Sequence, residues 1–590
     1  MKKKLVILLL ALLFAFVICS CSSTGNAINT EVLSEADNAF EVFKKQINTE
    51  RWKEYSRTYN YDSLKKYLVN NSADRNALTS DEIRLLQSGK TNNKRILSYE
   101  ETEQDIDLYF RVLRSHWGAY YYWGGNERFD QVKAAILNRF EGNNNIFRDD
   151  IVKAVHEEMS FIMADHFQFG SGKEARFIDK NDRYWFCYTD HVFYRDESGF
   201  YCNNEGLRYY YMGCDNETVS IERRLFRDGT LAYGLVQFAP KGNLHTEDVI
   251  RVSVDGEEKE LTVSWKESTP FSPDSLRDPD FKLVKEKSLS YIQLRSFDTK
   301  WEKKLIDFQD SGSKVRGSKL IVFDIMSNGG GNSRYFNTWF ENYTGNEGDA
   351  KEANGRRVGK LNNAEPKGNG AYNYRESQGT IQNSGSTVII LVDNNCGSSG
   401  EGALRGLKTL RNSMVIGSNS IGCASFGNVV NYTLPNSGIP FAYGTDLRSF
   451  SDPMENVDGK GFLPDIWCDP SHALEAVNNM LIRYNVCDEE ALTKLVREIL
   501  KASVKVTMEV EGDIVNVGEG FGRGRRAFRV FILADGKRVS DYEYSVKNNI
   551  GTIKKQSDGS LLLQADKAGD AVITIDYQGS SNSFRWHNSN

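Results

Sequence analysis

The sequence predicts a multidomain protein with an α/β core, preceded by helices and flanked by β-rich segments. Short apolar strands alternate with amphipathic helices from about 286 to 485, which is typical of an α/β core. Apolar residues recur at helical spacing in 101–175, whereas strand-like patterns mark 176–285 and 504–590. At 590 residues the chain is too long for a single hydrophobic core.

The N-terminus carries the pattern of an export signal. Three lysines precede an apolar run that extends to Ile18, and the tetrapeptide Ile18-Cys19-Ser20-Cys21 resembles a bacterial lipobox. In such a motif the chain is cut before the cysteine, which then receives a lipid. We expect residues 1–21 to form a lipoprotein signal peptide, Cys21 to be lipidated, and the protein to be anchored to a bacterial membrane, at the outer membrane or the cell surface. An ordinary signal peptide with Cys21 unmodified is the alternative.

The next segments are predicted to be a tether and a helical cap. Residues 22–100 are polar with a few helical stretches, and we expect a tether and entry segment there. Residues 101–175 are predicted to form an N-terminal helical cap. The last helix of this cap is predicted to end just before Ala164-Asp165-His166, and its apolar stripe comprises Ile151, Val155, Met159 and Ile162.

The segments around the core favour strands. Residues 176–285 are predicted to form a β-rich domain, with a hairpin at Arg251–Trp265 turning at Asp255-Gly256. After the core, residues 486–503 are expected to form a helical connector with Asp488 as its N-cap. Residues 504–590 are expected to form an Ig-like β-sandwich, because apolar residues alternate there with polar ones.

Composition excludes several functional classes. A formal net charge of −6 gives no reason to expect a nucleic-acid partner. The nine cysteines show no CxxC pair and no Cys/His ligand spacing, so a zinc site is not expected. The chemistry expected below implies no other metal and no organic cofactor. Export permits disulfides, and Cys202 with Cys214 is a reasonable candidate pair, although sequence leaves the pairing open.

The first feature that indicates catalytic chemistry is a strand followed by a serine and then by a helix. The apolar strand Thr387–Val392 is followed by a turn, and a helix begins near Ser398. A serine at such a junction exposes its hydroxyl beside the N–H groups of the first helical turn, which is the logic of a nucleophile elbow. The alternative is structural, since Ser398 and Glu401 also fit a helix-capping box.

A glycine-rich loop is the second signal. Asp324-Ile325-Met326-Ser327-Asn328-Gly329-Gly330-Gly331 directly follows an apolar strand. Successive glycines allow close backbone approach, so such a loop can lend an N–H group to an oxyanion. Alone, a glycine triplet more often forms a flexible turn.

Together these elements resemble the tail-specific (C-terminal-processing) and tricorn-core serine peptidases. The resemblance covers about 286–480 in the family's order and extends faintly over 101–170. The matching motifs are Asp324–Gly331, Ser398-Ser399-Gly400-Glu401, Val415-Ile416-Gly417 with Gly422, Leu434-Pro435-Asn436-Ser437-Gly438 (similar to a family strand) and Gly461-Phe462-Leu463-Pro464-Asp465. The resemblance implies a ClpP/crotonase-like α/β core spanning 286–485.

The resemblance also implies catalytic roles. Ser398 would be the nucleophile, and the N–H groups of Ser399 and of Gly329 or Gly330 would form the oxyanion hole. The tail-specific branch uses a lysine base, but the comparable place here reads Gly422-Cys423.

The tricorn-like branch instead implies His166 as base and Glu455 as the acid that orients it, and we place the chain closer to this Ser-His-Glu branch. A serine hydroxyl needs a base poised near neutral pH, which suits histidine. His116 is the rival base, and Glu401 or Asp165 could replace Glu455. Met326 departs from the family's common arginine, which supports the loop.

The expected function is therefore hydrolysis of peptide bonds in exported or extracellular peptides and unfolded proteins by a serine peptidase. Two alternatives remain open at this stage. One is a catalytically inactive relative that binds peptides or apolar ligands. The other is a surface adhesion or scaffold lipoprotein whose main function lies in residues 504–590.

Overall fold

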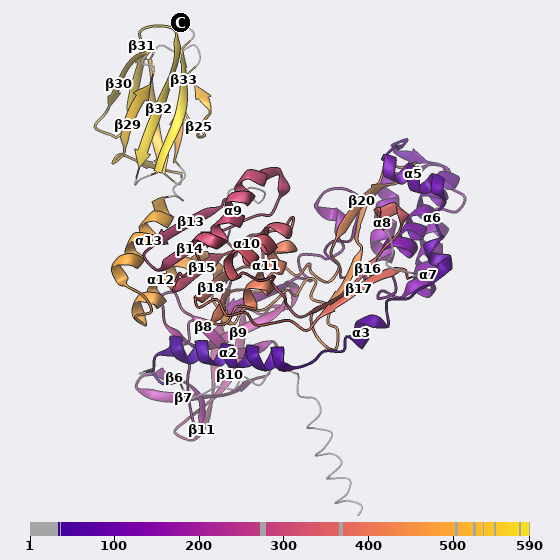
Figure 1. Ribbon diagram of the computed structural model, residues 1–590, viewed down its shortest axis with the longest axis horizontal. Coiled ribbons are helices and arrows are strands. Elements are labelled where there is room, and N and C mark those ends of the chain that lie inside the picture. The colour runs from indigo at the N-terminus through magenta and orange to yellow at the C-terminus, as the bar shows by residue number, and fades with distance from the viewer. Residues whose placement is uncertain are drawn as a thin grey trace, which may run out of the picture. The chain divides into compact units, whose positions relative to one another are not determined.

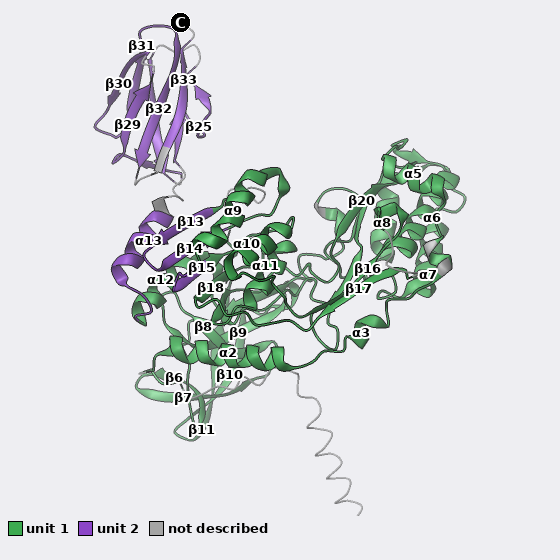
Figure 2. Cartoon of the chain, in the orientation of Figure 1, with its two compact units in different colours: residues 1–281, 294–316, 323–484 green, residues 282–293, 317–322, 485–590 purple. Residues whose placement is uncertain are grey.

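The computed structural model describes residues 33–35, 37–271, 279–364, 370–501, 506–522, 527–534, 536–547, 550–577 and 580–588. The predicted signal peptide and Cys21 lie outside these residues. Figure 2 shows the division of the chain into two units. Unit 1 comprises residues 1–281, 294–316 and 323–484, and unit 2 comprises 282–293, 317–322 and 485–590.

Unit 1 is built on a sheet whose strands there follow the order β12-β4-β9-β8-β23-β19-β18. In that order they span Lys266–Glu267, Tyr184–Tyr188, Leu231–Pro240, Val219–Leu225, Ile466–Trp467, Ser413–Gly417 and Thr387–Val392. Strands β18, β19, β23 and β8 are parallel, whereas β9 and β4 continue antiparallel. The predicted strand Thr387–Val392 is confirmed, and its interior is fully buried, as an apolar run between two covered faces should be.

Helices cover this sheet. Helix α11 (Ser399–Lys408) contacts β18 and β19, α2 (Ala39–Ser56) contacts β19, and α12 (Ala473–Arg483) contacts β8. Helix α9 (Glu302–Lys314) lies against α10 (Arg334–Thr344), which in turn contacts α11 (Figure 1). Strands and helices thus alternate as the sequence predicts, and the predicted α/β architecture is observed.

Strand β15 (Leu320–Asp324) leads into the glycine-rich loop. The boundary between the units runs through this strand, and its last two residues belong to unit 1. Immediately after it, the Ile325 N–H donates to the Leu391 carbonyl of β18 at 3.0 Å. The ends of β15 and β18 therefore lie side by side, which brings the two loops that follow them to the same edge of the sheet.

The segment predicted as a helical cap contains three main helices within unit 1. Aromatic side chains of these helices and of the segments that follow them share one core, in which Trp117 stacks on Phe167 with ring centroids 4.4 Å apart. The helices of this part of the chain are α3 (Asp62–Lys65), α4 (Ser72–Arg75), α5 (Ser80–Ser88), α6 (Tyr99–His116), α7 (Gly125–Asn138) and α8 (Arg148–Glu158). Small pairings accompany them: β1 (Ile96–Leu97) with β2 (Ile146–Phe147), β20 (Val429–Thr433) with β21 (Pro440–Gly444) and β3 (Gln168–Phe169), and β17 (Tyr372–Ser377) with β16 (Glu352–Arg357) and β22 (Asp446–Ser449).

Two local predictions in this region are wrong. Helix α8 ends at Glu158, not just before Ala164. Met159 and Ile162 are fully buried in the turn that follows, so burial rather than helical periodicity explains their apolar character. The Leu434–Gly438 motif, expected as a strand, forms the turn between β20 and β21.

The β-rich segment 176–285 divides between two sheets. Strands β4, β8, β9 and β12 join the large sheet of unit 1. A second, five-stranded sheet has the order β11-β10-β7-β6-β5, with the strands Glu257–Ser264, Glu247–Val254, Leu207–Cys214, Gly199–Asn204 and Tyr194–Asp196. The predicted hairpin is confirmed as β10 and β11, turning at Asp255-Gly256.

The candidate disulfide between Cys202 and Cys214 is absent, and both thiols are free. Cys202 on β6 lies opposite Tyr209 of β7, whereas Cys214 lies five residues further along β7. At about 3.4 Å per strand residue, this offset places the two cysteines too far apart to be bridged.

Unit 2 contains the hairpin of β13 (Lys282–Glu286) and β14 (Leu289–Gln293), which contacts α13 (Glu489–Lys501). The predicted N-cap of this helix is confirmed, because the Ala491 N–H donates to Asp488 Oδ1 at 2.8 Å. None of the helices in the described ranges combines the length and the apolar character that a membrane crossing requires.

The C-terminal part of unit 2 is a β-sandwich. One sheet follows the order β25-β24-β27-β31-β30 with β28 beside β27, and the other follows β26-β33-β32-β29. A single core unites them, with Trp586 and Phe584 of one sheet packed among Val530 and Ile532 of the other. The strands are β24 (Val506–Val510), β25 (Asp513–Val515), β26 (Gly520–Phe521), β27 (Ala527–Ala534), β28 (Lys537–Val539), β29 (Glu543–Lys547), β30 (Gly551–Lys555), β31 (Leu561–Ala565), β32 (Gly569–Tyr577) and β33 (Ser580–Asn588).

Candidate active site

Ser398 stands at a sharp turn between β18 and α11. Its backbone has φ 53° and ψ −116°, a conformation that non-glycine residues adopt only under strain. The helix begins at the next residue, so N–H groups of its first turn without helical acceptors lie beside the serine. This is the local geometry that the strand–serine–helix pattern predicts for a nucleophile.

The glycine-rich loop lies directly against this turn. A Cβ atom added at Gly330 would lie 2.8 Å from Ser398 Cβ and 2.9 Å from Ser399 N, and Gly330 has φ +98°. The Gly397 N–H also donates to the Asn328 carbonyl at 2.9 Å. Only glycine satisfies both the contact and the dihedral at position 330, so the close approach depends on that residue.

A buried ion pair between Arg295 and Asp324 supports the glycine-rich loop. Arg295 Nη2 donates to Asp324 Oδ2 at 2.7 Å, and both side chains are 1% exposed. Arg295 Nη1 also donates to the Met326 carbonyl at 2.8 Å. Position 326 lacks the family's common arginine, yet a guanidinium from another part of the chain supports the loop at that residue.

Asp393 fixes the other side of the loop. Ser327 has φ +55°, and its N–H and hydroxyl donate to the two oxygens of the Asp393 carboxyl at 2.6 and 3.1 Å. Burial raises the pKa of Asp393 to about 6, although the bonds from Ser327 and the charge of Arg295 oppose this rise. The loop is thus held at Asp324, Asp393 and Asn328.

The three backbone amides predicted for the oxyanion hole differ in whether they already form a hydrogen bond. The Gly330 N–H donates to Asn328 Oδ1 at 3.0 Å, so it is already in use. Among the described hydrogen bonds, the N–H groups of Gly329 and Ser399 have no protein acceptor. Gly329 and Ser399 are therefore the two amides available to a developing oxyanion.

Ser398 opens into a pocket of about 740 Å³ in unit 1. A pocket of this size accommodates several residues of an extended peptide or a small organic ligand. It is lined by Ser296–Thr299, Gly329–Ser333, Arg356, Ser398, Ser399, Gly402, Cys423, Ala424, Gly427–Val429 and Arg448.

Glu401 is buried beneath the serine turn and is fully used by local hydrogen bonds. Its carboxylate accepts the N–H of Ser398 at 3.1 Å, the hydroxyl of Ser420 at 2.6 Å, and the N–H groups of Gly422 and Cys423 at 2.9 and 3.0 Å. Burial raises the pKa of Glu401. Glu401 therefore ties the 420–423 segment to the serine turn, and none of these bonds involves an imidazole.

Cys423, which stands where the resemblance would place a lysine base, lies against the serine turn. Its Sγ lies 2.8 Å from the Ser398 N, within the same pocket. Burial raises the pKa of the Cys423 thiol well above its usual value, so the group stays neutral and cannot act as a base near pH 7.

His166 lies in the turn that follows α8, and it is partly buried. Burial lowers its pKa, while the neighbouring Asp165 and an interaction with the Phe426 backbone partly restore it. Its Nδ1 has no partner within the described part of the chain. His166 is not among the residues that line the Ser398 pocket, and no described hydrogen bond joins the two side chains.

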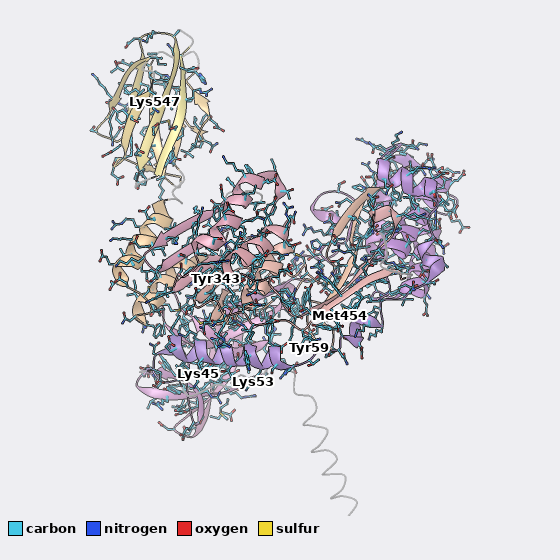
Figure 3. All side chains as sticks on the ribbon, viewed as in Figure 1. Lys45, Lys53, Tyr59, Tyr343, Met454 and Lys547 are labelled. Carbon is cyan, nitrogen blue, oxygen red and sulfur yellow. The ribbon has the colours of Figure 1, made fainter. Side chains whose placement is uncertain are left out.

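Among the described hydrogen bonds, none joins the predicted acid, Glu455, to this histidine. It is exposed, and its backbone N–H donates to Ser451 Oγ at 3.1 Å. The carboxyl that contacts the His166 turn is that of buried Asp458, which accepts the Asp165 N–H at 3.0 Å and the Ser425 N–H at 2.9 Å. Neighbouring Met454, labelled in Figure 3, donates its N–H to Ser63 Oγ at 2.7 Å.

The other acid and histidine candidates have structural partners. Asp165 forms ion pairs with Arg176, at 3.1 Å, and with Arg183. His116 is 3% exposed within α6 and does not line the pocket. Burial, with a contribution from Arg357, lowers the pKa of His116 to about 3, so its imidazole is neutral at physiological pH.

Sequence reasoning missed several residues of this pocket. Arg356 and Arg448 line it from neighbouring strands, and both bind the buried Asp446. No motif marks them. The only sequence signal is a charged residue within a short strand, which many surface strands share.

The fold and the serine turn now allow a comparison with known proteins. Residues 288–467 match the model of Peptidase family S41. Residues 288–467 are therefore similar to the S41 peptidases. This match confirms the predicted class of enzyme, a serine peptidase, and it covers the core but neither the helical cap nor the C-terminal sandwich.

Solved structures give weaker similarities. Mature CPAF in complex with lactacystin is 11% identical, with a TM-score of 0.34 over 68% of this chain and 99% of that chain. The photosystem II D1 C-terminal processing protease is 13% identical, with a TM-score of 0.32 over 63% and 93%. The tricorn protease is 15% identical, with a TM-score of 0.30 over 68% and 37%. Similarities this low extend none of those proteins' activities to this chain, and none of the curated proteins matches the sequence.

Proposed function

We propose that this protein is an exported, lipid-anchored serine peptidase that hydrolyses peptide bonds with Ser398 as nucleophile and His166 as base. The observation that carries the proposal is the strained Ser398 turn, which lines the pocket beside two unused backbone N–H groups. The ClpP/crotonase-like identity of the core and the Ig-like identity of the sandwich are part of this proposal, as is the Ser-His pair of the Ser-His-Glu branch; the exposed Glu455 is given no orienting role in the enzyme without substrate.

In the proposed reaction Ser398 Oγ attacks the carbonyl carbon of the substrate, and its proton passes to the His166 imidazole. The N–H groups of Ser399 and Gly329 bind the oxygen that becomes negative. Collapse of this intermediate expels the amine, which takes the proton from the imidazolium. Water then hydrolyses the ester on Ser398 by the same sequence of steps.

His166 supports this mechanism through its protonation state, because its lowered pKa leaves the imidazole neutral and able to accept a proton at pH 7. The mechanism requires the ring to turn into the pocket when substrate binds, since it does not line the pocket in the structure. Hydrogen bonds between nucleophile and base are often long before substrate arrives.

The test is labelling of the full mature chain with a fluorophosphonate, which phosphonylates an activated serine and releases fluoride. We expect labelling of the wild type, and its loss in Ser398→Ala and in His166→Ala. His116→Gln is the matched histidine control and should label like the wild type. Loss of labelling in the His116 variant with retention in the His166 variant would reassign the base.

A second candidate function rests on the separation of His166 from the pocket. A protein with this arrangement fixed would bind peptides without cleaving them. A folded wild type that resists labelling but binds peptides in the Ser398 pocket would favour this second candidate.

The anchoring part of the proposal rests on the Ile18–Cys21 motif alone. Cells grown with radioactive palmitate should label the wild type but not Cys21→Ala, and the variant should leave the membrane fraction. Equal labelling and equal membrane association of both proteins would contradict lipidation at this residue.

A further inference from the structure

Two arginines line the Ser398 pocket from adjacent strands. Strands β16 and β22 are antiparallel, and their register places Arg356 opposite Asp446 and Asn354 opposite Arg448. Both arginines line the pocket that also contains Ser398 and Gly329. The pair therefore lies where a substrate positioned for attack by Ser398 would extend.

A buried carboxylate holds this pair in place. Asp446 is fully buried and accepts Arg356 Nε at 2.7 Å, Arg448 Nη2 at 2.6 Å and Asn354 Nδ2 at 2.9 Å. Burial opposes ionisation of Asp446, yet Arg448 and Arg356 hold its pKa down at about 2. Because this anion stays charged and fixed, the guanidinium groups lose little conformational freedom when a ligand binds.

The arginines nevertheless remain accessible. The side chain of Arg356 is 43% exposed and that of Arg448 is 26% exposed. Each of them uses Nε and Nη2 for Asp446, and the described hydrogen bonds leave Nη1 of both without an acceptor. A Cβ atom added at Gly427, another lining residue, would lie 3.2 Å from the Arg448 guanidinium, so the arginine lies close against the pocket wall.

The balance of charge favours an anion at this wall. Two guanidinium groups share one carboxylate, Asp446, and the other carboxylate that acts on Arg448, Glu352, is itself paired with Arg405 and Arg375. Among the described residues that line the pocket, the other charged one is Asp298, which lies in a separate segment with Ser296 and Thr299 and whose carboxylate accepts the Lys300 N–H. Guanidinium forks bind carboxylates through paired N–H donors, which suits a peptide carrying an acidic group.

We infer that Arg356 and Arg448 bind a carboxylate of the peptide substrate while Ser398 attacks a nearby peptide bond. The inference rests on the proposed function and names its substrate class, a peptide with a negative group near the scissile bond. That carboxylate belongs either to an aspartate or glutamate side chain or to the C-terminus of the peptide.

Binding tests the inference independently of catalysis. Full-chain Ser398→Ala is immobilised and offered two synthetic hexapeptide libraries, one acetylated and amidated at its ends and one with free C-termini. Bound peptides are identified by mass spectrometry. Enrichment of aspartate and glutamate in the blocked library identifies the side-chain source, and dependence on the free C-terminus identifies the terminal source.

Arginine variants in the same background decide the location of binding. For the best peptide, the dissociation constant is measured by fluorescence anisotropy, and Arg356→Gln or Arg448→Gln should weaken binding about tenfold because a charge-assisted hydrogen-bonding pair is lost. Arg375→Gln is the matched control, since Arg375 lies on β17 outside the pocket and is 67% exposed. Equal weakening by all three variants would indicate a general charge effect and overturn the inference.

Further variants and outcomes separate effects on folding and on catalysis from effects on binding. Arg356→Lys and Arg448→Lys keep the charge beside Asp446, and they should also weaken binding because a lysine cannot form the planar fork. Libraries that show no acidic preference would overturn the inference even if the wild type labels with fluorophosphonate. Failure of that labelling would overturn the proposed peptidase and leave the carboxylate binding to be judged by anisotropy alone.

Discussion

The two sides of the candidate active site differ in how they are held. On the serine side, Ser398 and the glycine loop are fixed by backbone contacts and by the buried Arg295–Asp324 pair. On the histidine side, His166 follows Asp165, which pairs with two arginines, and one hydrogen bond from the Asp165 N–H joins the turn to Asp458. The serine side is complete for its proposed task, whereas the histidine side holds its imidazole outside the pocket.

The difference shows which parts of a site a local motif can specify. A nucleophile turn and an oxyanion hole are made of consecutive residues and their backbone amides, so a short motif contains them. A base and its orienting acid come from distant segments, and their placement depends on side-chain packing between those segments. The serine side and the histidine side should therefore respond differently to substitution.

The largest expected effect is the loss of the ion pair beneath the glycine loop. Arg295→Met leaves the Asp324 carboxylate buried without its guanidinium, which should cost about 3–5 kcal/mol of unfolding free energy. Urea denaturation followed by tryptophan fluorescence measures the loss. Arg316→Met is the control, because Arg316 binds only backbone carbonyls and no carboxylate among the described contacts. Equal stability of the two variants would mean that the pair does not hold the serine side.

Next in size is the effect of a methyl group between the glycine loop and the nucleophile. Gly330→Ala would place Cβ 2.8 Å from Ser398 Cβ at φ +98°, so the loop must shift away from the serine. We expect fluorophosphonate labelling to slow about 100-fold, as when one oxyanion donor is lost.

Gly329→Ala is the control for the same loop. Nothing lies within 4 Å of a Cβ atom at Gly329, and the N–H group remains. This variant should label at nearly the wild-type rate. A comparable loss in both variants would contradict a specific contact at Gly330.

The rate of fluorophosphonate labelling should fall in acid, at a pH set by the pKa of His166. Burial holds the pKa of His166 below 6.5, so the neutral base persists as pH falls through that value and is lost only when pH passes the lowered pKa. Below that point the labelling rate should fall about tenfold per pH unit. A midpoint above 6.5 would contradict the assignment of His166 as base in its present surroundings.

A smaller, about tenfold, effect is expected from the carboxyl that contacts the His166 turn. In Asp458→Asn one of two acceptor oxygens becomes an NH₂ group, so either the Asp165 or the Ser425 N–H loses its acceptor. The turn should then hold His166 less well, and labelling should slow with a shifted pH midpoint. A purely structural role would lower stability but leave the pH midpoint unchanged.

Much of the fold could be predicted because the evidence is local. The strand Thr387–Val392, the Asp488 cap and the Asp255-Gly256 hairpin each depend on neighbours a few residues away. The end of α8 was missed because Met159 continues an apolar stripe outside the helix, where burial rather than periodicity selects the residue.

The parts of the site that could not be predicted depend on pairs distant in sequence. Arg295 and Asp324 are 29 residues apart, Arg356 and Asp446 are 90 apart, and Asp165 and Asp458 are 293 apart. Nothing in the local pattern of either partner specifies the other. The Ser398 turn was predictable by contrast, because the strand, the serine and the helix that form it are consecutive.

The smallest expected effect concerns the acid that the resemblance assigns. Glu455→Gln should change the labelling rate less than about twofold, because exposed side chains without a specific partner tolerate substitution. Asp458→Asn makes the matching carboxyl-to-amide change three residues away, at a buried group whose pKa is raised by burial, so the two variants separate the loss of an exposed carboxylate from the loss of a contact. If Glu455→Gln instead proves the more damaging of the two, the 455–458 segment must rearrange on substrate binding to bring Glu455 to His166. Substrate binding would then complete the active site, and the separation of His166 from the Ser398 pocket would describe the enzyme without substrate.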